Sequence, residues 1–545
     1  MSMSRALRFS GRFSWTCATW FSSVNTIRLL IFIFTRFQTT IGIKITSFTR
    51  GNPLSPDTRL NICLVCSELN PLAKTGGLAD VTAALAHYFH SRGHPTLVLT
   101  PFYASLDVSG FAIEPLPVLE QLDLTLGDRR FEYRIVKAKP TDSGPDIHLL
   151  DCPDLYHGTE LYSGPDEHLR FILLSRVAIE MCQRLKFTPD IFHCHDWHTA
   201  LVPAYLKTIY NWDLMFKDSK TVLTLHNMAY QGVFDSGILD QTGLADSAEM
   251  LDQEDLAGGR INFLKTGVMH ADLLTTVSPS YSREILEPEN GMGLDGHLRA
   301  RGVSVTGILN GVDYTEWNPQ SDPLIPFPYS AKDLSGKEKN KQALMKETGL
   351  EYQFDKPLVG MATRLTYQKG IDLVQQVLPG VISSREMSLV VVGNGDSEYE
   401  EFFRWMQAEY PGRVSFFAGF NNQLTHRIEA GSDMFLMPSR YEPCGLNQMY
   451  SLKYGTVPVV RATGGLIDSV QPFDHVKGTG TGVVFHDYDA NGLKWALNTA
   501  LDLYENKFAW KQVVFNGMAK DYSWEKQGKI YLERFRRLLK LSRNG

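Results

Sequence analysis

One glycine-containing segment of this 545-residue chain has the composition of an anion-binding loop. In residues 71–80 (PLAKTGGLAD), Gly76 and Gly77 precede a predicted helix, and Lys74 adds a positive charge. A glycine backbone can approach a ligand closely, and both a helix N-terminus and a lysine attract anions such as phosphate. The segment matches neither the dinucleotide-binding nor the P-loop fingerprint, so a plain structural turn is an equally good interpretation.

A second basic segment, residues 362–370 (ATRLTYQKG), follows a predicted strand. Its Arg364 and Lys369 place two positive charges at the carboxyl end of that strand, where open α/β sheets bind ligands. An arginine fork and a compact lysine charge suit a phosphate leaving group, on which negative charge grows during the reaction. The alternative interpretation is a pair of solvated surface cations.

An acidic side chain stands at the corresponding place of another predicted strand. Glu442, within residues 439–445 (SRYEPCG), is placed to accept hydrogen bonds from sugar hydroxyls, and the alternative is an ordinary surface glutamate. Thr463, Gly464 and Gly465, in the sequence RATGGL, repeat the pattern of glycine before a helix. This repetition predicts a second phosphate-binding loop.

Residues 192–200 (FHCHDWHTA) hold three histidines and an aspartate, which at first resemble a metal cluster. The usual zinc signatures are missing, and no matching set of ligands occurs elsewhere, so we expect no metal. Asp196 and Trp197 follow a buried strand, where they could bind a sugar hydroxyl and stack on a sugar ring, respectively. The alternative is a set of core histidines with hydrogen bonds of their own. His226 ends the next apolar strand, where it lines a ligand site or caps the sheet.

The segments that must position these residues follow a regular order in the sequence. Short apolar runs alternate with stretches whose apolar residues have helical spacing, as in parallel sheets with crossover helices. The strands predicted in the first half are 62–66, 96–101, 191–194, 221–225, 273–277 and 307–309. Those predicted in the second half are 357–363, 389–393, 415–419, 434–438, 457–461 and 482–485. The expected architecture is α/β, with two doubly wound domains facing a cleft.

Four prolines in residues 317–329 exclude a continuous helix and a central strand, which places the domain boundary there. We predict a leader at 1–57, an N-terminal domain at 58–318 and a C-terminal domain at 319–521. Residues 522–545 carry apolar positions at helical spacing, which predicts a terminal amphipathic helix that packs back towards the N-terminal domain.

The formal net charge of -6 argues against nucleic acid as a partner. Residues 1–56, however, hold seven basic side chains and no acidic one, which is typical of an organelle transit peptide. A mis-called start of a bacterial reading frame is the alternative. The apolar run 29–34 is too short to span a membrane. The seven scattered cysteines favour a reducing compartment, and Cys63 and Cys66 would point to opposite faces of a strand.

Six motifs, in order, resemble those of the glycogen and starch synthase family of glycosyltransferases. They are KTGGLADV, HDWH, HNMAYQG, RLTYQKG, SRYEPCGLNQ and RATGGL, and the resemblance runs from about residue 61 to 531. It implies the GT-B fold, with two Rossmann-like domains, and retaining transfer of glucose from a sugar nucleotide to the non-reducing end of an α-1,4-glucan. It also implies that no catalytic metal and no cofactor are needed. Tyr450 stands where related retaining transferases carry a second glutamate, as is usual in the glycogen synthase branch.

The resemblance also implies residue roles. Asp196 would bind hydroxyls of the transferred glucose, Glu442 would contact the donor glucose, and the backbone carbonyl of His226 would support the cationic sugar ring. Arg364 and Lys369 would hold the departing diphosphate. The remaining donor-binding positions would be Lys74, Gly76, Gly77, Thr463, Gly464 and Gly465.

The resemblance favours ADP-glucose as the donor, although no residue selects adenine over uracil. The other functions considered are a GT-B enzyme that uses UDP-glucose, a sucrose or trehalose-type synthase, a phosphorylase with pyridoxal phosphate, and a non-catalytic glucan-binding protein. We expect a plastid location if residues 1–56 are a genuine transit peptide, and a cytoplasmic one if the chain is bacterial. Glycogen and starch remain equally good products.

Overall fold

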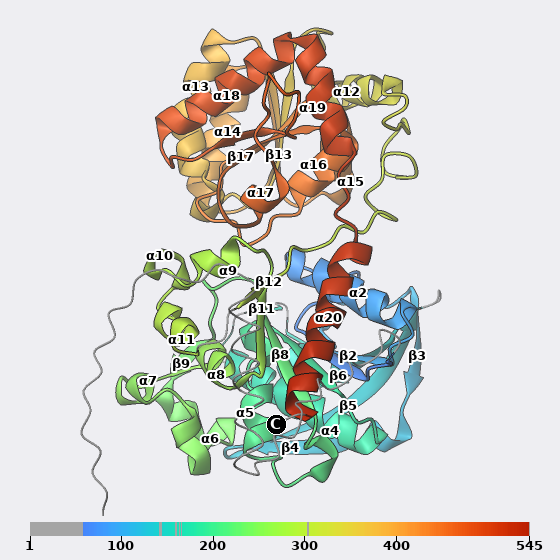
Figure 1. Ribbon diagram of the computed structural model, residues 1–545, viewed down its shortest axis with the longest axis vertical. Coiled ribbons are helices and arrows are strands. Elements are labelled where there is room, and N and C mark those ends of the chain that lie inside the picture. The colour runs from blue at the N-terminus through green and yellow to red at the C-terminus, as the bar shows by residue number, and fades with distance from the viewer. Residues whose placement is uncertain are drawn as a thin grey trace, which may run out of the picture. The chain divides into compact units, whose positions relative to one another are not determined.

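The computed structural model describes residues 58–543, apart from 141–143, 159–160, 163, 165 and 302–304. The predicted leader therefore lies outside the described residues. Among the helices that the structure describes, none has both the length and the apolar content needed to cross a membrane. Two large sheets, one in each half of the chain, organise the fold (Figure 1).

The first sheet has ten strands in the order β12-β11-β8-β7-β1-β2-β6-β5-β3, with β4 paired to β5. Neighbours from β12 to β6 are parallel, whereas β3 and β4 pair antiparallel with β5, which is itself antiparallel to β6. The strands are β1 (Ile62–Val65), β2 (Thr96–Pro101), β3 (Phe111–Pro115), β4 (Leu122–Leu126), β5 (Arg129–Pro140), β6 (Asp146–Asp151), β7 (Ile191–His195), β8 (Lys220–Leu225), β11 (Leu273–Thr276) and β12 (Thr306–Gly307).

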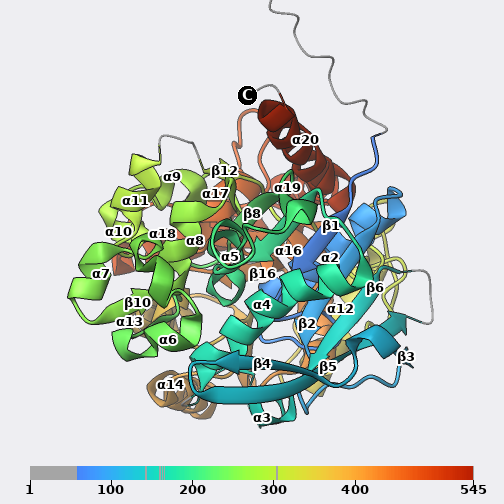
Figure 2. The ribbon, with the colours of Figure 1, turned by 90° about the horizontal axis from the view of Figure 1, so that it is seen from below.

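The antiparallel strands were missing from our prediction, as was β6. Side chains of β4 alternate strictly between buried and exposed, and those of β5 do so over most of its length. Such alternation is typical of antiparallel strands with one solvated face, whereas the predicted strands were recognised by continuous apolar runs. Figure 2 shows β3, β4 and β5 together at one side of the sheet. The prediction for the first half therefore found six of its parallel strands, and it missed the parallel strand β6 and the antiparallel strands β3, β4 and β5.

The second sheet has six strands, all parallel, in the order β15-β14-β13-β16-β17-β18. The chain builds outward from β13 in one direction and then from β16 in the other, so the sheet is doubly wound as predicted. Its strands are β13 (Leu358–Ala362), β14 (Ser388–Gly393), β15 (Val414–Ala418), β16 (Met434–Met437), β17 (Val457–Arg461) and β18 (Val483–Phe485), each within one residue of the prediction.

Helices connect the strands of both sheets. In the first half they are α2 (Gly77–Ser91), α3 (Pro153–Tyr156), α4 (Glu167–Leu185), α5 (Val202–Lys207), α6 (Leu239–Thr242), α7 (Gln253–Ala257), α8 (Phe263–His270), α9 (Tyr281–Glu284), α10 (Pro288–Gly291) and α11 (Asp295–Ala300). A small antiparallel sheet joins β9 (Val233–Asp235) to β10 (Arg260–Asn262). In the second half they are α12 (Ser335–Glu347), α13 (Ile371–Ser384), α14 (Ser397–Glu409), α15 (Asn422–Gly431), α16 (Asn447–Tyr454), α17 (Gly464–Ser469), α18 (Ala490–Glu505), α19 (Lys507–Met518) and α20 (Trp524–Arg543).

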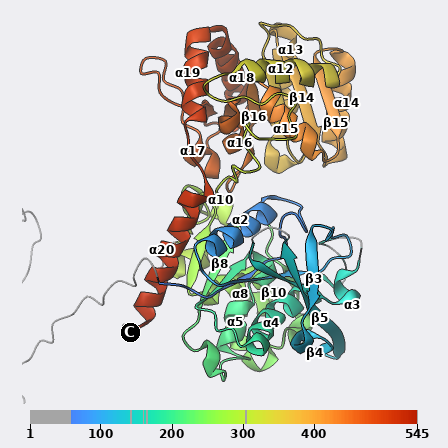
Figure 3. The ribbon, with the colours of Figure 1, turned by 90° about the vertical axis from the view of Figure 1, so that its right-hand side faces the viewer.

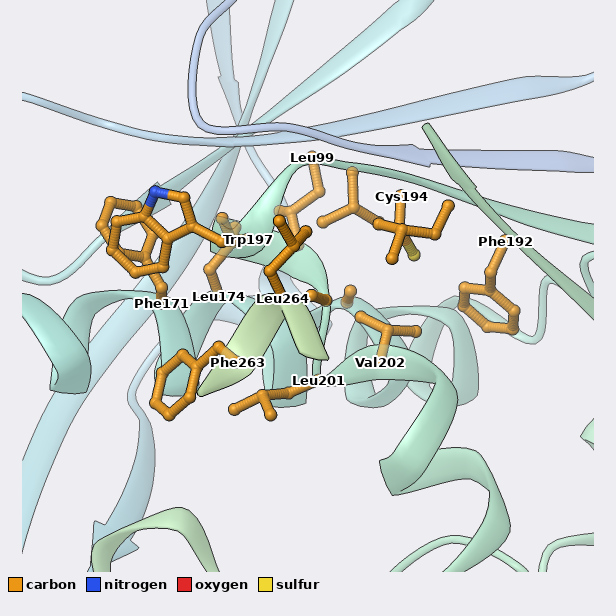
Figure 4. Close-up of a cluster of buried hydrophobic side chains, with 14 of the residues drawn as sticks. Leu99, Phe171, Leu174, Phe192, Cys194, Trp197, Leu201, Val202, Phe263 and Leu264 are labelled. Atoms are coloured by element: carbon orange, nitrogen blue, oxygen red, sulfur yellow. The ribbon is translucent and has the colours of Figure 1, made fainter. Parts of the chain in front are cut away.

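Apolar cores cover both faces of the first sheet. Cys63 of β1 belongs to the core that includes α4, α5 and α8, whereas Cys66, just after β1, belongs to the core that includes α2 and α20. The two cysteines therefore face opposite sides of the sheet, as their spacing predicted. Figure 4 shows part of the first core, where Phe171, Trp197 and Phe263 gather.

The helix predicted at the end of the chain is α20, and it packs on the first half of the protein (Figure 3). Phe535 of α20 lies 5.6 Å, between ring centroids, from Phe89 of α2. Tyr531 of α20 lies 5.5 Å from the ring of His193 in β7. Gly528 of α20 lies so close to Tyr88 of α2 that a Cβ atom would stand 2.3 Å from the ring. The last helix therefore completes the core on one face of the first sheet.

Candidate active site

The first predicted phosphate loop is held by a carboxylate that the sequence analysis missed. Glu68, three residues after β1, is 3% exposed. It accepts hydrogen bonds from Thr75 N at 2.6 Å, Thr75 Oγ1 at 2.7 Å and Gly76 N at 3.3 Å, and from Tyr162 Oη at 2.6 Å. Backbone N–H groups of the loop that we expected to bind a ligand anion thus already bind the carboxylate of Glu68. The signal that could have revealed Glu68 is its place after a strand, the same signal that revealed Glu442.

Lys74 lies in this loop, partly exposed, and forms an ion pair with Asp80 at 2.7 Å. Burial raises the pKa of Asp80, and the neighbouring Lys74 opposes that rise. The Gly76 backbone is open, since a Cβ atom there would have no neighbour within 4 Å, whereas at Gly77 a Cβ atom would meet Leu446 at 3.3 Å. The loop therefore keeps space for a ligand at Gly76 and a cation beside it.

The second basic segment brings Lys369 and Glu442 together. Lys369 Nζ lies 2.5 Å from Glu442 Oε2, and Ser439 Oγ donates to the same oxygen at 3.0 Å. Glu442 is 5% exposed, so the ion pair is largely shielded from water. Arg364, in contrast, is exposed, and its guanidinium reaches Gln368 Oε1 only at 3.5 Å, the limit of a hydrogen bond. Arg364 is thus available to an external anion, whereas Lys369 must share its charge with Glu442.

The RATGGL loop lies against the Glu442 segment. Gly464 has a φ of +45°, and a Cβ atom there would stand 1.9 Å from the carbonyl oxygen of Glu442, so glycine is required. Gly464 N donates to Glu284 Oε1 at 2.7 Å, and Thr463 Oγ1 lies 3.4 Å from Glu284 Oε2. Gly465 N donates to the carbonyl of Glu442 at 3.1 Å. A carboxylate therefore binds this loop as well, and Glu284 gave no sign of this role in the sequence.

Asp196 and His226 meet at the ends of the adjacent strands β7 and β8. Asp196 Oδ1 accepts a hydrogen bond from His226 N at 2.6 Å. Burial raises the pKa of Asp196 to about 7, although the N–H groups of His226 and Asn227 favour the ionised form. The backbone of Asp196, with φ +56° and ψ -171°, lies in a region that is essentially reserved for glycine. Strain of this kind is concentrated at functional sites, which supports Asp196 as a site residue.

The proposed stacking of Trp197 on a sugar ring was wrong. Trp197 is 6% exposed and packs edge-on against Phe171, with ring centroids 4.8 Å apart (Figure 4). The positive φ of Asp196 turns the chain at the end of β7, so that the indole enters the core. Among the histidines, His193 hydrogen-bonds to Thr224 and His195 to His226, as the core interpretation expected.

Residues after strands of the two sheets are joined by hydrogen bonds. Ser278 Oγ, which follows β11, donates to the carbonyl of Pro443 at 2.6 Å. Ser280 donates to Asp468 of α17 through both N and Oγ, at 2.7 and 2.8 Å. With the Glu284 contact, these bonds connect the carboxyl side of the first sheet to the loops that carry Glu442 and Gly464.

Two residues that follow Glu442 in the sequence lie in the core. Cys444 is buried and burial raises the pKa of its thiol, so the structure favours a spectator over a reactive thiol. Tyr450 stacks on Trp317 with ring centroids 3.8 Å apart. Within the described part of the chain, the structure has no group of three or more His, Cys, Asp or Glu side chains arranged to hold a metal ion.

Comparison with known proteins shows the family to which this chain belongs. Residues 61–300 match the family described as starch synthase catalytic domain, and residues 347–513 match the family described as glycosyl transferases group 1. The glycogen synthase of Koribacter versatilis is 42% identical over 478 residues, which cover 87% of this chain and 97% of that protein. This chain belongs to the glycogen and starch synthase family. Glycogen synthase 1 of Geobacter sulfurreducens is likewise 42% identical, over 494 residues that cover 89% and 97% of the two chains.

A solved structure of a starch synthase has the same fold as this chain. The catalytic domain of starch synthase IV from Arabidopsis thaliana, bound to ADP and acarbose, superposes with a TM-score of 0.82 at 31% identity, covering 89% of this chain and 100% of that one. Sucrose-phosphate synthase from Thermosynechococcus elongatus, with a TM-score of 0.56 at 18% identity and the same coverage, shares the fold alone. The GT-B fold class and the family resemblance are therefore confirmed, whereas the domain limits and the residue roles stay predictions.

Proposed function

We propose that the protein is a retaining glucosyltransferase that moves glucose from ADP-glucose to the non-reducing end of an α-1,4-glucan, in glycogen or starch synthesis. The observation that carries the proposal is the meeting of Lys369 and Glu442 beside the exposed Arg364, at the carboxyl edge of the second sheet. This places cations for a diphosphate next to an acceptor for sugar hydroxyls. The names of the relatives, and the ADP bound to starch synthase IV, support the same activity.

In this proposal each half of the chain supplies part of the site. Arg364 and Lys369 bind the diphosphate, together with Lys74 and the backbones of Gly76 and Gly77. The loop Thr463, Gly464 and Gly465 borders the phosphates. Glu442 and Asp196 accept hydrogen bonds from hydroxyls of the transferred glucose, and the carbonyl of His226 faces its anomeric carbon.

The reaction proceeds on one face of the sugar. The bond between the anomeric carbon and the phosphate oxygen breaks, and its electron pair leaves with ADP, where Arg364 and Lys369 stabilise the added negative charge. The carbonyl oxygen of His226 stabilises the oxocarbenium-like ring. A glucan hydroxyl then bonds to the anomeric carbon from the face that ADP has left, and its proton passes to a phosphate oxygen of ADP. The configuration is therefore retained.

We further propose that this reaction needs neither a metal nor a cofactor. Three cationic side chains, Lys74, Arg364 and Lys369, supply the positive charge that a divalent ion would otherwise provide for the diphosphate. The chemistry is a glycosyl transfer without a change of oxidation state, so no redox group takes part.

The test is incorporation of glucose into a glycogen primer by the purified chain, with ADP-glucose and UDP-glucose in parallel and with no added metal. We expect incorporation from ADP-glucose. Incorporation only from UDP-glucose would support the proposed glucosyl transfer but contradict ADP-glucose as the donor. A folded protein that incorporates glucose from neither donor would contradict the proposed glucosyltransferase activity. Co-sedimentation with glycogen would then identify a glucan-binding protein.

The compartment depends on residues 1–57, which lie outside the described residues. We propose a plastid location if these residues direct a fused reporter into isolated chloroplasts, and a cytoplasmic location, as in bacteria, if they do not. The import assay itself distinguishes the two.

A further inference from the structure

His195 is bonded to a predicted site residue and has no role in the reaction described above. It lies at the end of β7, and its Nδ1 is 2.9 Å from Nε2 of His226. We propose that His195 is a positioning residue that donates its Nδ1–H to His226 and thereby fixes both the ring orientation and the tautomer of His226. The inference rests on the proposed role of His226 in the glucosyl transfer.

The hydrogen bond between the two rings contains a single proton. Burial lowers the pKa of His226 to about 3, and burial together with His193 and His226 lowers the pKa of His195 well below its ordinary value. Both imidazoles are therefore neutral at physiological pH, and each carries one N–H. Because the two facing nitrogens form a hydrogen bond, only one of them holds a proton.

The direction of this hydrogen bond follows from the other nitrogen of His195. His195 Nε2 is buried and has no hydrogen-bond partner among the described residues. If His195 donates through Nδ1, Nε2 is a bare lone pair; if His226 donates instead, Nε2 is a buried N–H without an acceptor. In proteins, buried N–H groups without an acceptor are rarer than buried acceptors without a donor, because an unsatisfied buried N–H costs free energy of folding. We therefore assign the donor to His195 and the Nδ1–H tautomer to His226.

The assignment means that His226 is held from two sides. Its ring accepts a hydrogen bond from His195, and its backbone N–H is bonded to Asp196. The N–H of Asn227, which shares a peptide plane with the carbonyl of His226, is also bonded to Asp196, so this peptide has little freedom to rotate. The proton on Nδ1 also makes the outer edge of the ring a hydrogen-bond donor. A hydroxyl that meets this edge must act as an acceptor.

The neighbouring His193 provides a matched control. It lies two residues earlier on β7, is equally buried, and its ring centroid is 4.2 Å from that of His195. Its Nε2, however, is bonded to Thr224 Oγ1 at 2.8 Å rather than to His226. A purely structural role in the core would therefore be shared by both histidines, whereas a positioning role belongs to His195 alone.

The first experiment reads the tautomer directly, in the whole chain labelled with ¹⁵N-histidine. The two ring nitrogens of a neutral histidine differ in chemical shift according to which one is protonated, and a His226→Gln variant identifies the His226 signals. We expect the Nδ1–H form of His226 in the wild type and in His193→Leu, and a mixture of forms in His195→Leu. An Nε2–H form in the wild type would overturn the proposal.

The second experiment measures kcat and KM for glucan synthesis. We expect His195→Leu to lower kcat about tenfold or more, because a buried hydrogen bond to a site residue is lost, with KM for the donor little changed. His195→Asn places an amide N–H near the position of Nδ1 and should restore most of kcat. Equal losses of kcat in His193→Leu and His195→Leu, or no rescue by Asn, would show a structural role and overturn the proposal.

The two experiments separate this inference from the proposed function. A wild-type chain that makes no glucan would contradict the proposed glucosyltransferase activity. The NMR spectrum would still determine the tautomer of His226. If His195→Leu fails to fold, the wild-type spectrum and the kinetics of His195→Asn decide the proposal.

Discussion

At the scale of residues, most of the groups predicted to bind a diphosphate already bond to the protein's own carboxylates, and exposed Arg364 is the exception. Glu68 accepts from the first loop, Glu284 accepts from the second, and Glu442 pairs with Lys369. A donor that binds here must exchange these bonds for bonds of its own. The net free energy of binding is therefore smaller than the number of cations and N–H groups would indicate.

Arg364→Ala and Lys369→Ala should each reduce kcat strongly. A charge-assisted hydrogen bond contributes about 1.5–3 kcal/mol, so the expected loss is on the order of 10–150-fold. Steady-state kinetics with ADP-glucose measures it. The control is Arg385→Ala, because Arg385 pairs with Asp502 and Glu505 on helix α18, away from these residues. Near-normal turnover in either variant would remove that residue from the mechanism.

Acid should destabilise the protein through its buried histidines. The native pKa of His193 is lowered by burial to about 3, whereas an unfolded histidine titrates near its ordinary value of about 6.5. Between these values the unfolded chain binds more protons, so the free energy of unfolding falls as the pH falls. Asp196, with its pKa raised to about 7, acts in the opposite sense, since its native carboxyl binds a proton below pH 7.

His193→Leu removes one of these histidines and should reduce the acid sensitivity. From pH 7 to pH 5 one such histidine costs about 2 kcal/mol, because the unfolded form gains a proton that the native form does not. Urea unfolding of both proteins at the two pH values measures the difference. Parallel losses of stability in wild type and variant would contradict the assignment.

The sequence alone identified candidate site residues at the strand ends, but it did not predict the contacts that these residues make. Asp196, Glu442, Arg364 and Lys369 were all recognised by their place after a strand, because parallel strands bring such residues to one edge of a sheet. The carboxylates that occupy the loops were not recognised. Glu284 ends a short helix that is distant in sequence from Gly464, and only the tertiary packing brings them together. The prediction that Trp197 stacks on a sugar was wrong because the residue type of Asp196 does not indicate its positive φ, which turns Trp197 into the core.

At the scale of elements, α9 touches α17 in a way that should weaken donor binding. Glu284, the last residue of α9, accepts the N–H of Gly464, the first residue of α17. If the donor phosphates use this N–H, Glu284 competes with them. Glu284→Gln replaces a charged hydrogen bond by a neutral one, which weakens the competing contact by roughly 1 kcal/mol, and ADP binding should tighten by about threefold to tenfold. Isothermal titration calorimetry measures the Kd.

A matched control for this variant lies in the same contact. Asp468 of α17 accepts two hydrogen bonds from Ser280 but does not touch Gly464 N. Asp468→Asn should loosen the contact between the two helices and leave the Kd for ADP unchanged. If both variants tighten binding equally, the cause is the looser contact rather than competition for the N–H group.

The elements of the second sheet were predictable because its strands are apolar runs, which are buried over most of their length in all strands except β15. The antiparallel strands β4 and β5 were not predicted, since exposed side chains alternate with buried ones along much of their length and interrupt any apolar run. Apolar runs therefore indicated most of the parallel strands that carry the candidate site, and they missed β6 and the antiparallel part of the first sheet.

At the scale of the whole molecule, α20 stabilises the first half of the protein although it follows the second. Phe535 is fully buried against Phe89, and its replacement by alanine should cost about 3–5 kcal/mol. Urea unfolding measures this loss. Leu541→Ala on the same helix is the control, because Leu541 is 67% exposed and its replacement should change little. Similar effects of both variants would show that α20 does not depend on this contact.

Deletion of residues 1–56 should leave full activity, because every predicted site residue and both sheets lie after residue 57. The glucan synthesis assay compares the truncated and full-length chains at equal concentration. A truncated protein that is folded but inactive would show that the leader is part of the enzyme.

The packing of α20 also has a consequence for synthesis on the ribosome. The last strand of the first sheet ends at residue 307, but α20 begins only at residue 524. At roughly 5–20 residues per second, translation of the intervening 216 residues (308–523) takes on the order of 10–40 seconds. During this time Phe89 and its apolar neighbours are not yet covered by α20. The first half of the nascent chain therefore exposes an apolar face to chaperones until the final helix emerges.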